Sequence, residues 1–369
     1  MGEFAKASPF LSKINSLLLP AQARSAKKAQ MKQILTAFAL MFFCAIPGNS
    51  QSVSPLMLQR TIALPGVTGK FDHFAIDLAG HRLLAAATGN HSVEVIDLKS
   101  DKVEQSISGL GKPHGLAWVD ATSSLYVADG SLCELRVYKG SPLKLAGTIK
   151  LSNDADDMVY DDAHRRLYVG HGGGSAAVPG RVAVVDTTTF TLIDNLPVAT
   201  HPEALDLDAP SRRIFANIAD SSDVAVIDGA TNTITAHWKL ASAKDNVPMA
   251  YDRGRHVLYV ACRTPATLLA LDGNSGAELS RATTGEGADD LFYDASLGRV
   301  YVISGAGEVD AFEVSGTALK AIGITRTVAG AKTALFVPSE SALYVGVPAT
   351  SGKPAEIRVY STAIQKADK

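Results

Sequence analysis

The sequence predicts an all-β fold, a seven-bladed β-propeller, and three observations predict it. Short apolar segments with the same local pattern return every 42 to 47 residues. No segment after residue 53 has the length and the 3.6-residue period of a helix. The seventh repeat lacks its last strand, while a spare strand-like segment precedes the first. A period in this range that is built of strands is typical of a propeller with one four-stranded blade per repeat.

The inner strand of each predicted blade follows a residue that opens the repeat. These opening residues are Asp72, His114, Asp156, Glu203, Val247, Asp289 and Lys332, with spacings of 42, 42, 47, 44, 42 and 43. The inner strands are expected at residues 74–77, 116–119, 158–160, 204–207, 249–251, 291–293 and 334–337. The repeat length therefore divides the chain into seven similar units.

The second and third strands carry two further signatures. A Leu-Tyr-Val pattern occurs at 125–127, 167–169, 258–260, 300–302 and 343–345, with looser copies at 83–85 and 214–216. A Val-Ile-Asp strand end occurs at 95–97, 184–186, 226–228 and 269–272. Because these segments are apolar at nearly every position, they fit strands that neighbouring blades cover on both faces.

Closure of the ring is expected to use both ends of the repeat region. The seventh unit ends after residues 356–360, and residues 57–64 precede the first unit. Pairing these two segments would complete the last blade and remove exposed strand edges, which otherwise invite aggregation.

These repeats resemble the YVTN family of seven-bladed propellers, and more closely its secreted, YncE-like bacterial members. The resemblance covers residues 55–361 and depends on the Leu-Tyr-Val strands, the Val-Ile-Asp strand ends, His201-Pro202-Glu203 and the segment 289–294. It implies the propeller fold and export from the cytoplasm. Its motifs are informative about fold and not about function, because this architecture serves enzymes, binding proteins and surface proteins alike.

The first 52 residues predict an export signal. Residues 31–52 have a positive start, an apolar run at 34–46 and small polar residues after it, which is the pattern of a secretory signal peptide. Residues 1–30 are interpreted as a basic leader or a mis-assigned start, and residues 53–369 as a single propeller domain. A lipid anchor on Cys44 is the alternative. The apolar run is too short for a stable membrane helix, so we expect a periplasmic or secreted protein without stable membrane insertion.

Charge is nearly balanced, at 35 Lys and Arg against 37 Asp and Glu. A global field that would attract nucleic acid is therefore absent, and no nucleic-acid partner is expected.

Polar residues are expected to gather at one mouth of the central channel, where the loops leading into the inner strands emerge. The predicted ligand-binding residues are Asp72, His73, His114, Asp156, Asp157, His201, Glu203, Asn246, Asp289 and Asp290. Lys332 also lies at an inner-strand entry, and other loops on that face add Asn90, His91, Asp129, His171, Asp220 and Arg263. Such a ring can hold a polar ligand or a divalent ion such as Ca²⁺, with Asp72, His73, Asp156, Glu203 and Asp289 as candidate metal ligands. The alternative is that each side chain only caps a turn and satisfies backbone donors.

Three functional hypotheses follow from this reading. The first is a binding or scaffold module for a small ligand or a periplasmic protein partner. The second is a metal-assisted hydrolase of the propeller-lactonase kind, in which an ion polarises a carbonyl and a His moves a proton. The third is an accessory subunit of a periplasmic redox enzyme. No enzyme motif is present to favour catalysis, and no catalytic residue is assigned.

Overall fold

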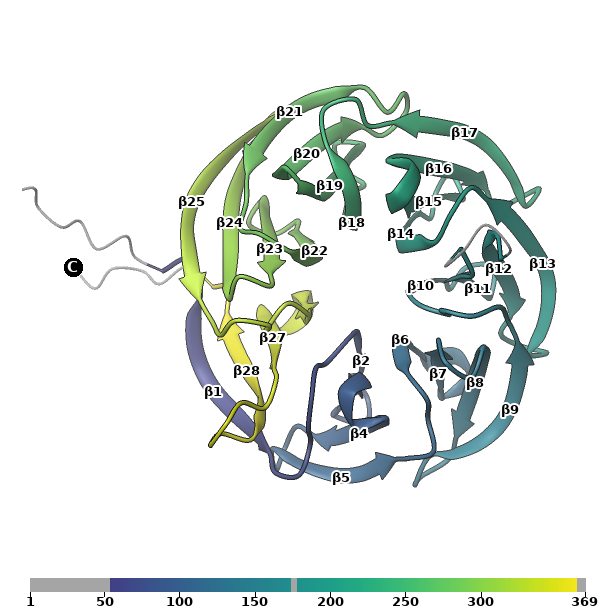
Figure 1. The fold of residues 1–369 in the computed structure, drawn as a ribbon, viewed down its shortest axis with the longest axis vertical. Helices are drawn as coiled ribbons and strands as arrows, with labels where there is room; N and C mark the ends of the chain where they lie inside the picture. Colours follow the sequence, from purple (N-terminus) through teal and green to yellow (C-terminus); the bar gives the residue numbers. More distant parts are fainter. Residues whose placement is uncertain (1–53, 174–177, 364–369) are drawn as a thin grey trace, which may run out of the picture. The chain divides into compact units, whose positions relative to one another are not determined.

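The computed structural model describes residues 54–173 and 178–363, and its strands form seven four-stranded sheets. The sheets follow one another around a central axis, as Figure 1 shows. The predicted seven-bladed β-propeller is therefore confirmed. The predicted leader, residues 1–30, and the predicted signal peptide, residues 31–52, lie outside the described residues.

Each of the first six blades uses four consecutive antiparallel strands, counted from the channel outward. Blade 1 contains β2 (Phe74–Asp77), β3 (Arg82–Ala87), β4 (Ser92–Asp97) and β5 (Lys102–Ile107). Blade 2 contains β6 (Pro113–Val119), β7 (Ser124–Asp129), β8 (Glu134–Lys139) and β9 (Lys144–Lys150). Blade 3 contains β10 (Met158–Asp161), β11 (Arg166–His171), β12 (Gly180–Asp186) and β13 (Thr191–Val198).

The later blades repeat this order. Blade 4 contains β14 (Pro202–Asp208), β15 (Arg213–Ile218), β16 (Asp223–Asp228) and β17 (Thr233–Lys239). Blade 5 contains β18 (Lys244–Asp252), β19 (Val257–Thr264), β20 (Ala266–Asp272) and β21 (Glu278–Thr283). Blade 6 contains β22 (Ala288–Asp294), β23 (Arg299–Ser304), β24 (Glu308–Ser315) and β25 (Ala318–Arg326). Short 3₁₀ turns occur at η1 (Thr88–Asn90), η2 (Asp120–Thr122), η3 (Ala219–Ser221) and η4 (Pro338–Glu340).

Blade 7 is completed by the strand that comes first in the sequence. It contains β26 (Ala334–Val337), β27 (Ala342–Val347) and β28 (Ala355–Ser361), with β1 (Met57–Leu64) as its outermost strand. β1 pairs antiparallel with β28, from Met57 opposite Ser361 to Leu64 opposite Ala355. The closure predicted from the two ends of the repeat region is confirmed.

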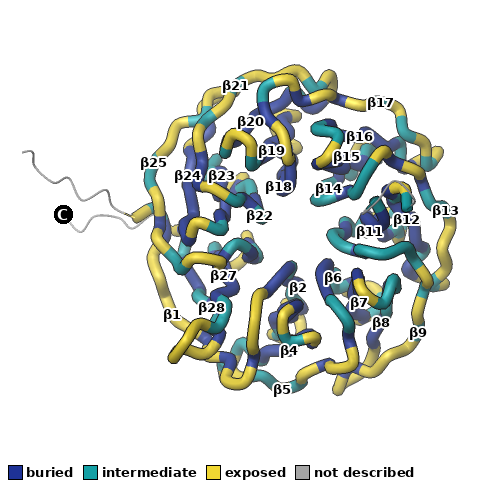
Figure 2. Tube along the Cα trace, viewed as in Figure 1, coloured by how far each residue is buried: buried dark blue, intermediate teal, exposed yellow. Residues whose placement is uncertain are grey.

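The hydrophobic core lies between neighbouring blades. The Tyr of each Leu-Tyr-Val strand is buried, and its accessibility is 0% at Tyr126, Tyr168, Tyr259 and Tyr301. Exposed residues concentrate on the outer strands, where they alternate with less exposed ones (Figure 2). The inner three strands of a blade therefore supply most of the buried core, and the outer strand supplies most of the solvated rim.

The start of the inner strand departs from regular pairing in blades 1 to 6, and this departure positions the site. Both Asp72 and His73 bond to one residue on β3, because the Asp72 amide donates to the Ala86 carbonyl at 2.9 Å and the Ala86 amide donates to the His73 carbonyl at 3.1 Å. Asp156 and Asp157 share Gly170 on β11 in the same way. Register shifts also occur in β6, β14, β18 and β22. A bulge lets two successive side chains turn toward one side, whereas a regular strand alternates them.

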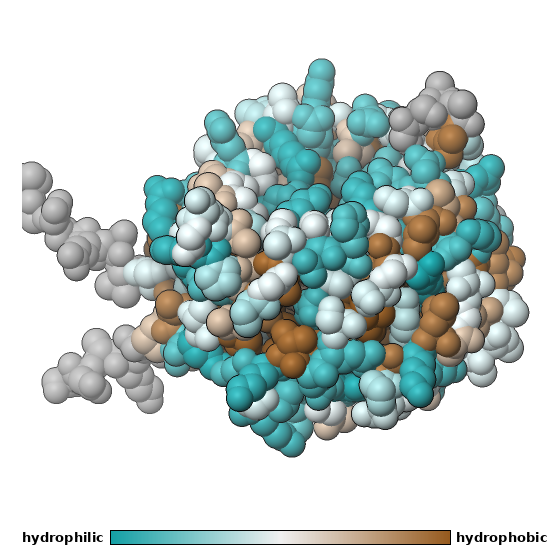
Figure 3. All heavy atoms as spheres, turned by 60° about the horizontal axis from the view of Figure 1, so that its bottom comes forward, coloured by the Kyte–Doolittle hydropathy of each residue, from teal (hydrophilic) through white to brown (hydrophobic). Residues whose placement is uncertain are grey.

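The surface is mixed in polarity. On the face drawn in Figure 3, hydrophobic groups are interspersed among hydrophilic ones. Several of the exposed large hydrophobic residues lie on the outer strands, such as Leu145, Leu192 and Leu279. In the described part of the chain, no helix has the length and hydropathy needed to cross a membrane.

Candidate functional site

Nine of the ten residues predicted to bind a ligand lie around the central channel. They are Asp72, His73, His114, Asp156, Asp157, His201, Glu203, Asp289 and Asp290. They come from blades 1, 2, 3, 4 and 6, so residues up to about three fifths of the chain apart contribute to one site. What they bind stays a prediction.

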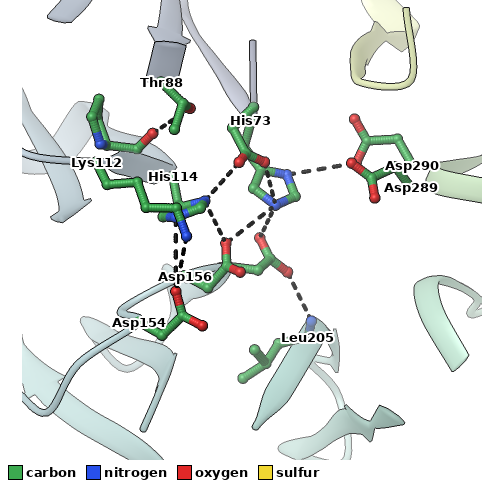
Figure 4. Close-up of polar contacts among 12 residues, drawn as sticks. His73, Thr88, Lys112, His114, Asp154, Asp156, Leu205, Asp289 and Asp290 are labelled. Carbon is green, nitrogen blue, oxygen red and sulfur yellow. Dashed lines mark hydrogen bonds and ion pairs between the residues drawn. The ribbon is translucent and has the colours of Figure 1, made fainter. Parts of the chain in front are cut away.

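His73 occupies the centre of this group (Figure 4). Its Nε2 atom lies 3.8 Å from Asp72 Oδ1, 3.9 Å from Asp156 Oδ1 and 4.0 Å from Asp157 Oδ1. Its Nδ1 atom lies 3.5 Å from Asp290 Oδ1. One imidazole therefore faces carboxylates from three blades.

Each of these four carboxylates has its second oxygen held by a neighbour. Asp72 Oδ2 lies 2.6 Å from His114 Nδ1, and Asp156 Oδ2 lies 3.4 Å from His201 Nε2. Backbone amides hold the other two, since Leu205 donates to Asp157 Oδ2 at 2.8 Å and Ala334 donates to Asp290 Oδ2 at 2.6 Å. The four carboxylates are thereby oriented with one oxygen toward His73.

The channel contains two cavities that meet at His73 and Asp157. The mouth chamber has a volume of about 150 Å³ and is lined by Lys70, Asp72, His73, His114, Asp156, Asp157, Glu203, Ala204, Val247, Arg263, Asp289 and Lys332. The inner chamber has a volume of about 380 Å³, and its lining includes Phe74, Leu116, Met158, Leu205, Met249, Leu291 and Phe336. The mouth chamber is rich in charge, and the inner chamber combines these apolar side chains with polar groups such as Asp157, Asp206, Arg253 and Asp290. Ligand sites in proteins are typically concave with a few convergent polar groups, which both chambers provide.

The charges around His73 change its protonation. Burial by itself would lower the pKa of His73, but the carboxylates of Asp157, Asp290, Asp72 and Asp156 outweigh burial and raise the pKa to about 10. Burial raises the pKa of Asp290 to about 8, against the opposing effect of His73. Positive charge is therefore stabilised at the centre of the channel.

Asp156 and Glu203 respond in opposite directions to the same surroundings. Burial opposes ionisation of Asp156, but the hydrogen bond from His201 and the charges of nearby histidines hold its pKa well below its usual range. Burial raises the pKa of Glu203 to about 7, and the negative charge of Asp156 adds to this effect. Within residues 54–173 and 178–363, the Glu203 carboxyl makes no hydrogen bond or ion pair. It is therefore available to a ligand in the mouth chamber.

Asp289 differs from the other candidate metal ligands because two cations hold it. Lys332 Nζ lies 2.6 Å from Asp289 Oδ2, and Arg263 donates to Asp289 Oδ1. Two groups of residues have the spacing to share an ion, namely Asp72 with His73 and Asp156, and Asp156 with His201 and Glu203. Four of the five predicted metal ligands thus fall in these groups, and Asp289 does not.

His201 contacts the chamber residue Asp156 without lining either chamber itself, and Asn246 lines neither chamber. The Asn246 side chain is fully buried and donates to Asn217 Oδ1 and to the Asp223 carbonyl, both at 2.9 Å. Val247, the residue that opens this repeat, lines the chamber, and the register shift in β18 lies between Asn246 and Met249. The expected location of Asn246 was wrong, and its role is to satisfy buried groups between blades.

Some residues expected at the mouth support the loops and do not line the chamber. Asp129 accepts hydrogen bonds from the amides of Gly111, Lys112 and Leu132. His171 accepts from the Ser152 amide at 3.0 Å and bonds Asn195 through its other nitrogen at 2.9 Å. For these two residues the turn-capping alternative describes the contacts.

Sequence reasoning missed Asp206 and Lys70. Asp206 lines the inner chamber, where it accepts hydrogen bonds from the amides of Leu207 at 2.6 Å and Tyr251 at 2.7 Å. An Asp within an otherwise apolar inner strand was the available signal. Lys70 lies 3.9 Å from Asp72 Oδ2, just before the first repeat.

The fold and this site together define a seven-bladed β-propeller with a charged central channel. No family model matches the chain. A 144-residue segment, 38% of the chain, is 27% identical to the "Seven-bladed beta-propeller protein Rv1057" of Mycobacterium tuberculosis (strain ATCC 25618 / H37Rv) and covers 36% of that protein's length.

A likeness to a solved structure covers more of the chain. One chain in a crystal structure of the mitotic checkpoint complex superposes with a TM-score of 0.68 at 13% identity, over 83% of this chain and 91% of that one. At this identity the likeness concerns the fold alone.

Proposed function

We propose that this chain is a secreted or periplasmic propeller of the YVTN type, similar to YncE-like proteins, that binds a small polar ligand in the mouth chamber. The observation that carries the proposal is the lining of this chamber. The unpaired carboxyl of Glu203 and the cations Lys70, Arg263 and Lys332 line one cavity of about 150 Å³. A chamber of this volume suits a compact polar molecule.

Thermal unfolding with small polar compounds tests this proposal. A suitable panel contains amino acids, hydroxy acids, lactones and cell-wall fragments. A ligand present at about 100 times its Kd stabilises the folded protein by about 2.7 kcal/mol. We expect Glu203→Gln to remove the shift and Asp220→Asn to retain it, because Asp220 is an exposed carboxylate of η3 that does not line the chamber. A shift that survives Glu203→Gln unchanged would contradict binding at this place.

A metal-assisted hydrolase is the second candidate function. It is favoured by Glu203, whose pKa is raised to about 7 mainly by burial, because a group that titrates near neutral pH can exchange protons with a substrate. Hydrolysis of a lactone panel by the purified protein tests it. Activity that is absent from the wild-type protein with added divalent ions would exclude this candidate for the compounds used.

Export is a separate part of the proposal. We expect residues 31–52 to be removed as a signal peptide and the propeller domain to start near residue 53. N-terminal sequencing of the protein recovered from its native compartment tests this. A mature protein that retains residues 31–52 would contradict it.

A further inference from the structure

We propose that the mouth chamber holds one divalent transition-metal ion of the Zn²⁺ or Mn²⁺ class, bound by Asp72 Oδ1, His73 Nε2 and Asp156 Oδ1. The inference deepens the proposed function and rests on the mouth chamber being a binding site. It specifies the atoms that hold an ion, the groups that orient those atoms, and the class of ion.

The spacing of the three atoms is the first argument. His73 Nε2 lies 3.8 Å from Asp72 Oδ1 and 3.9 Å from Asp156 Oδ1. Hydrogen bonds of this type span about 2.7 to 3.2 Å, so these distances are too long for them. Atoms that each lie about 2.0 to 2.4 Å from a shared ion are separated from one another by about 3 to 4 Å. Asp72, His73 and Asp156 each offer an atom within 4.8 Å of the other two.

The lack of other partners for these atoms is the second argument. The Oδ1 atom of Asp156 is buried and has no hydrogen-bond partner, since His114 Nδ1 lies 3.6 Å away, too far for a hydrogen bond. Within residues 54–173 and 178–363, the His73 ring makes no hydrogen bond. Buried polar atoms nearly always have a bonding partner. A metal ion between Asp156 Oδ1 and the His73 ring would give both groups such a partner.

The surrounding contacts hold the three side chains in place. His114 Nδ1 fixes Asp72 through Oδ2 at 2.6 Å, and His201 Nε2 approaches Asp156 Oδ2 at 3.4 Å. Asp290 Oδ1 lies 3.5 Å behind His73, at Nδ1. Metal sites commonly orient a ligating imidazole with a carboxylate on its other nitrogen. They orient a ligating carboxylate with a hydrogen bond to its second oxygen. Asp290, His114 and His201 are therefore positioning residues.

The donor atoms select the class of ion. Ca²⁺ prefers six to eight oxygen ligands, whereas an imidazole nitrogen beside carboxylates suits Zn²⁺, Mn²⁺ or Fe²⁺. The three atoms contain one nitrogen and two oxygens, and the adjoining chamber leaves space for water or a ligand at further positions. The site therefore favours a transition-metal ion over the Ca²⁺ expected from the sequence.

Calorimetric titration of the chelator-treated full-length protein with ZnCl₂, MnCl₂ and CaCl₂ tests the inference. We expect one Zn²⁺ or Mn²⁺ per chain and weaker binding of Ca²⁺. Asp156→Asn should weaken binding at least about 100-fold, and His114→Gln by about 10-fold to 100-fold, as is usual for positioning groups. Asp206→Asn is the matched control, because this carboxylate lies in the inner chamber and bonds backbone amides, and it should bind like the wild type.

A measurement on the wild-type protein keeps the inference testable if a variant does not fold. Co²⁺ in the same site should give visible absorption bands that added Zn²⁺ removes. The inference is overturned if neither Zn²⁺ nor Mn²⁺ binds, or if Asp156→Asn binds them as the wild type does. In that case a protonated His73 serves as the cation among these carboxylates.

The outcome separates this inference from the proposed function. A small polar compound that raises the melting temperature in the presence of chelator, and loses its effect in Glu203→Gln, would support the binding module while the metal titration fails. Metal binding without any stabilising compound would support the ion site and leave the small-ligand proposal contradicted.

Discussion

His114 Nδ1 in blade 2 donates a hydrogen bond to Asp72 Oδ2 in blade 1 over 2.6 Å. The imidazole is 5% exposed, so this contact joins two blades in a place that water scarcely reaches. The same carboxylate turns its other oxygen toward His73, 3.8 Å away. One contact thus links blade packing to the geometry of the channel.

Removal of this contact should lower stability. A buried hydrogen bond to a charged group contributes about 1.5 to 3 kcal/mol, so we expect His114→Ala to reduce the free energy of unfolding by about that amount. Urea unfolding measures it. A double-mutant cycle with Asp72→Asn should show coupling, and two additive effects would mean that the contact contributes nothing specific.

The stability of the propeller should depend on pH through His171. Burial lowers the pKa of this histidine to about 4, below its ordinary value of 6.5. Between these two values the unfolded state binds the proton and the folded state does not, so stability rises with pH across this window. The contribution of His171 is complete above about pH 6.5 and is lost as the pH falls toward 4, by about 2 to 3 kcal/mol.

The comparison of wild type with His171→Asn isolates this effect. Unfolding curves at pH 4.5, 5.5 and 7 should show a smaller loss toward acid in the variant. Equal slopes for both proteins would exclude His171 as the source of the pH dependence.

The titration of Asp206 should change stability with pH in the opposite direction to that of His171. Burial raises its pKa to about 6 from 3.8, so the folded state binds the proton more tightly than the unfolded state. Its favourable contribution is complete below about pH 3.8 and is lost as the pH rises through about 6. Asp206→Asn should therefore gain stability relative to wild type between pH 4 and pH 8, by less than about 3 kcal/mol. Melting temperatures of the variant and the wild type at pH 4 and pH 8 test this prediction. A gain in stability at pH 4 only would contradict it.

The closing strand should be necessary for a stable ring. Ile62 in β1 is fully buried, and truncating an Ile in a core usually costs about 2 to 5 kcal/mol. We expect Ile62→Ala to lower the free energy of unfolding by that amount, measured with denaturant. Leu58→Ala on the same strand is the control and should change it by less than about 0.5 kcal/mol, because Leu58 is 50% exposed. Similar losses in both variants would contradict a role for burial in the closure.

The fold could be predicted from sequence because each blade repeats one buried pattern. The Tyr of the Leu-Tyr-Val strands fills the space between blades, so the same residue type returns wherever that space returns. The partner of β1 could also be predicted, because only one blade lacked a fourth strand. The repeated sequence pattern therefore made both the fold and the closing strand predictable.

The site could be predicted only in outline, because bulges decide which side chains face the channel. Asp72 and His73 both face it as a result of their shared pairing with Ala86. Asn246 precedes the repeat-opening position, which Val247 occupies, and next to the register shift in β18 its side chain bonds Asn217 and does not line the chamber. A residue count cannot place such a shift.

The way in which β1 closes the ring also has a mechanical consequence. The outer ends of the pair coincide, because Met57 at the start of β1 lies opposite Ser361 at the end of β28. A force that pulls the two chain ends apart therefore breaks the hydrogen bonds between β1 and β28 one after another, starting at this end of the pair. Strands pulled in shear would instead share the load across the whole pair. The ring should accordingly yield at lower force when it is stretched by its termini than a ring whose closing strands are pulled in shear.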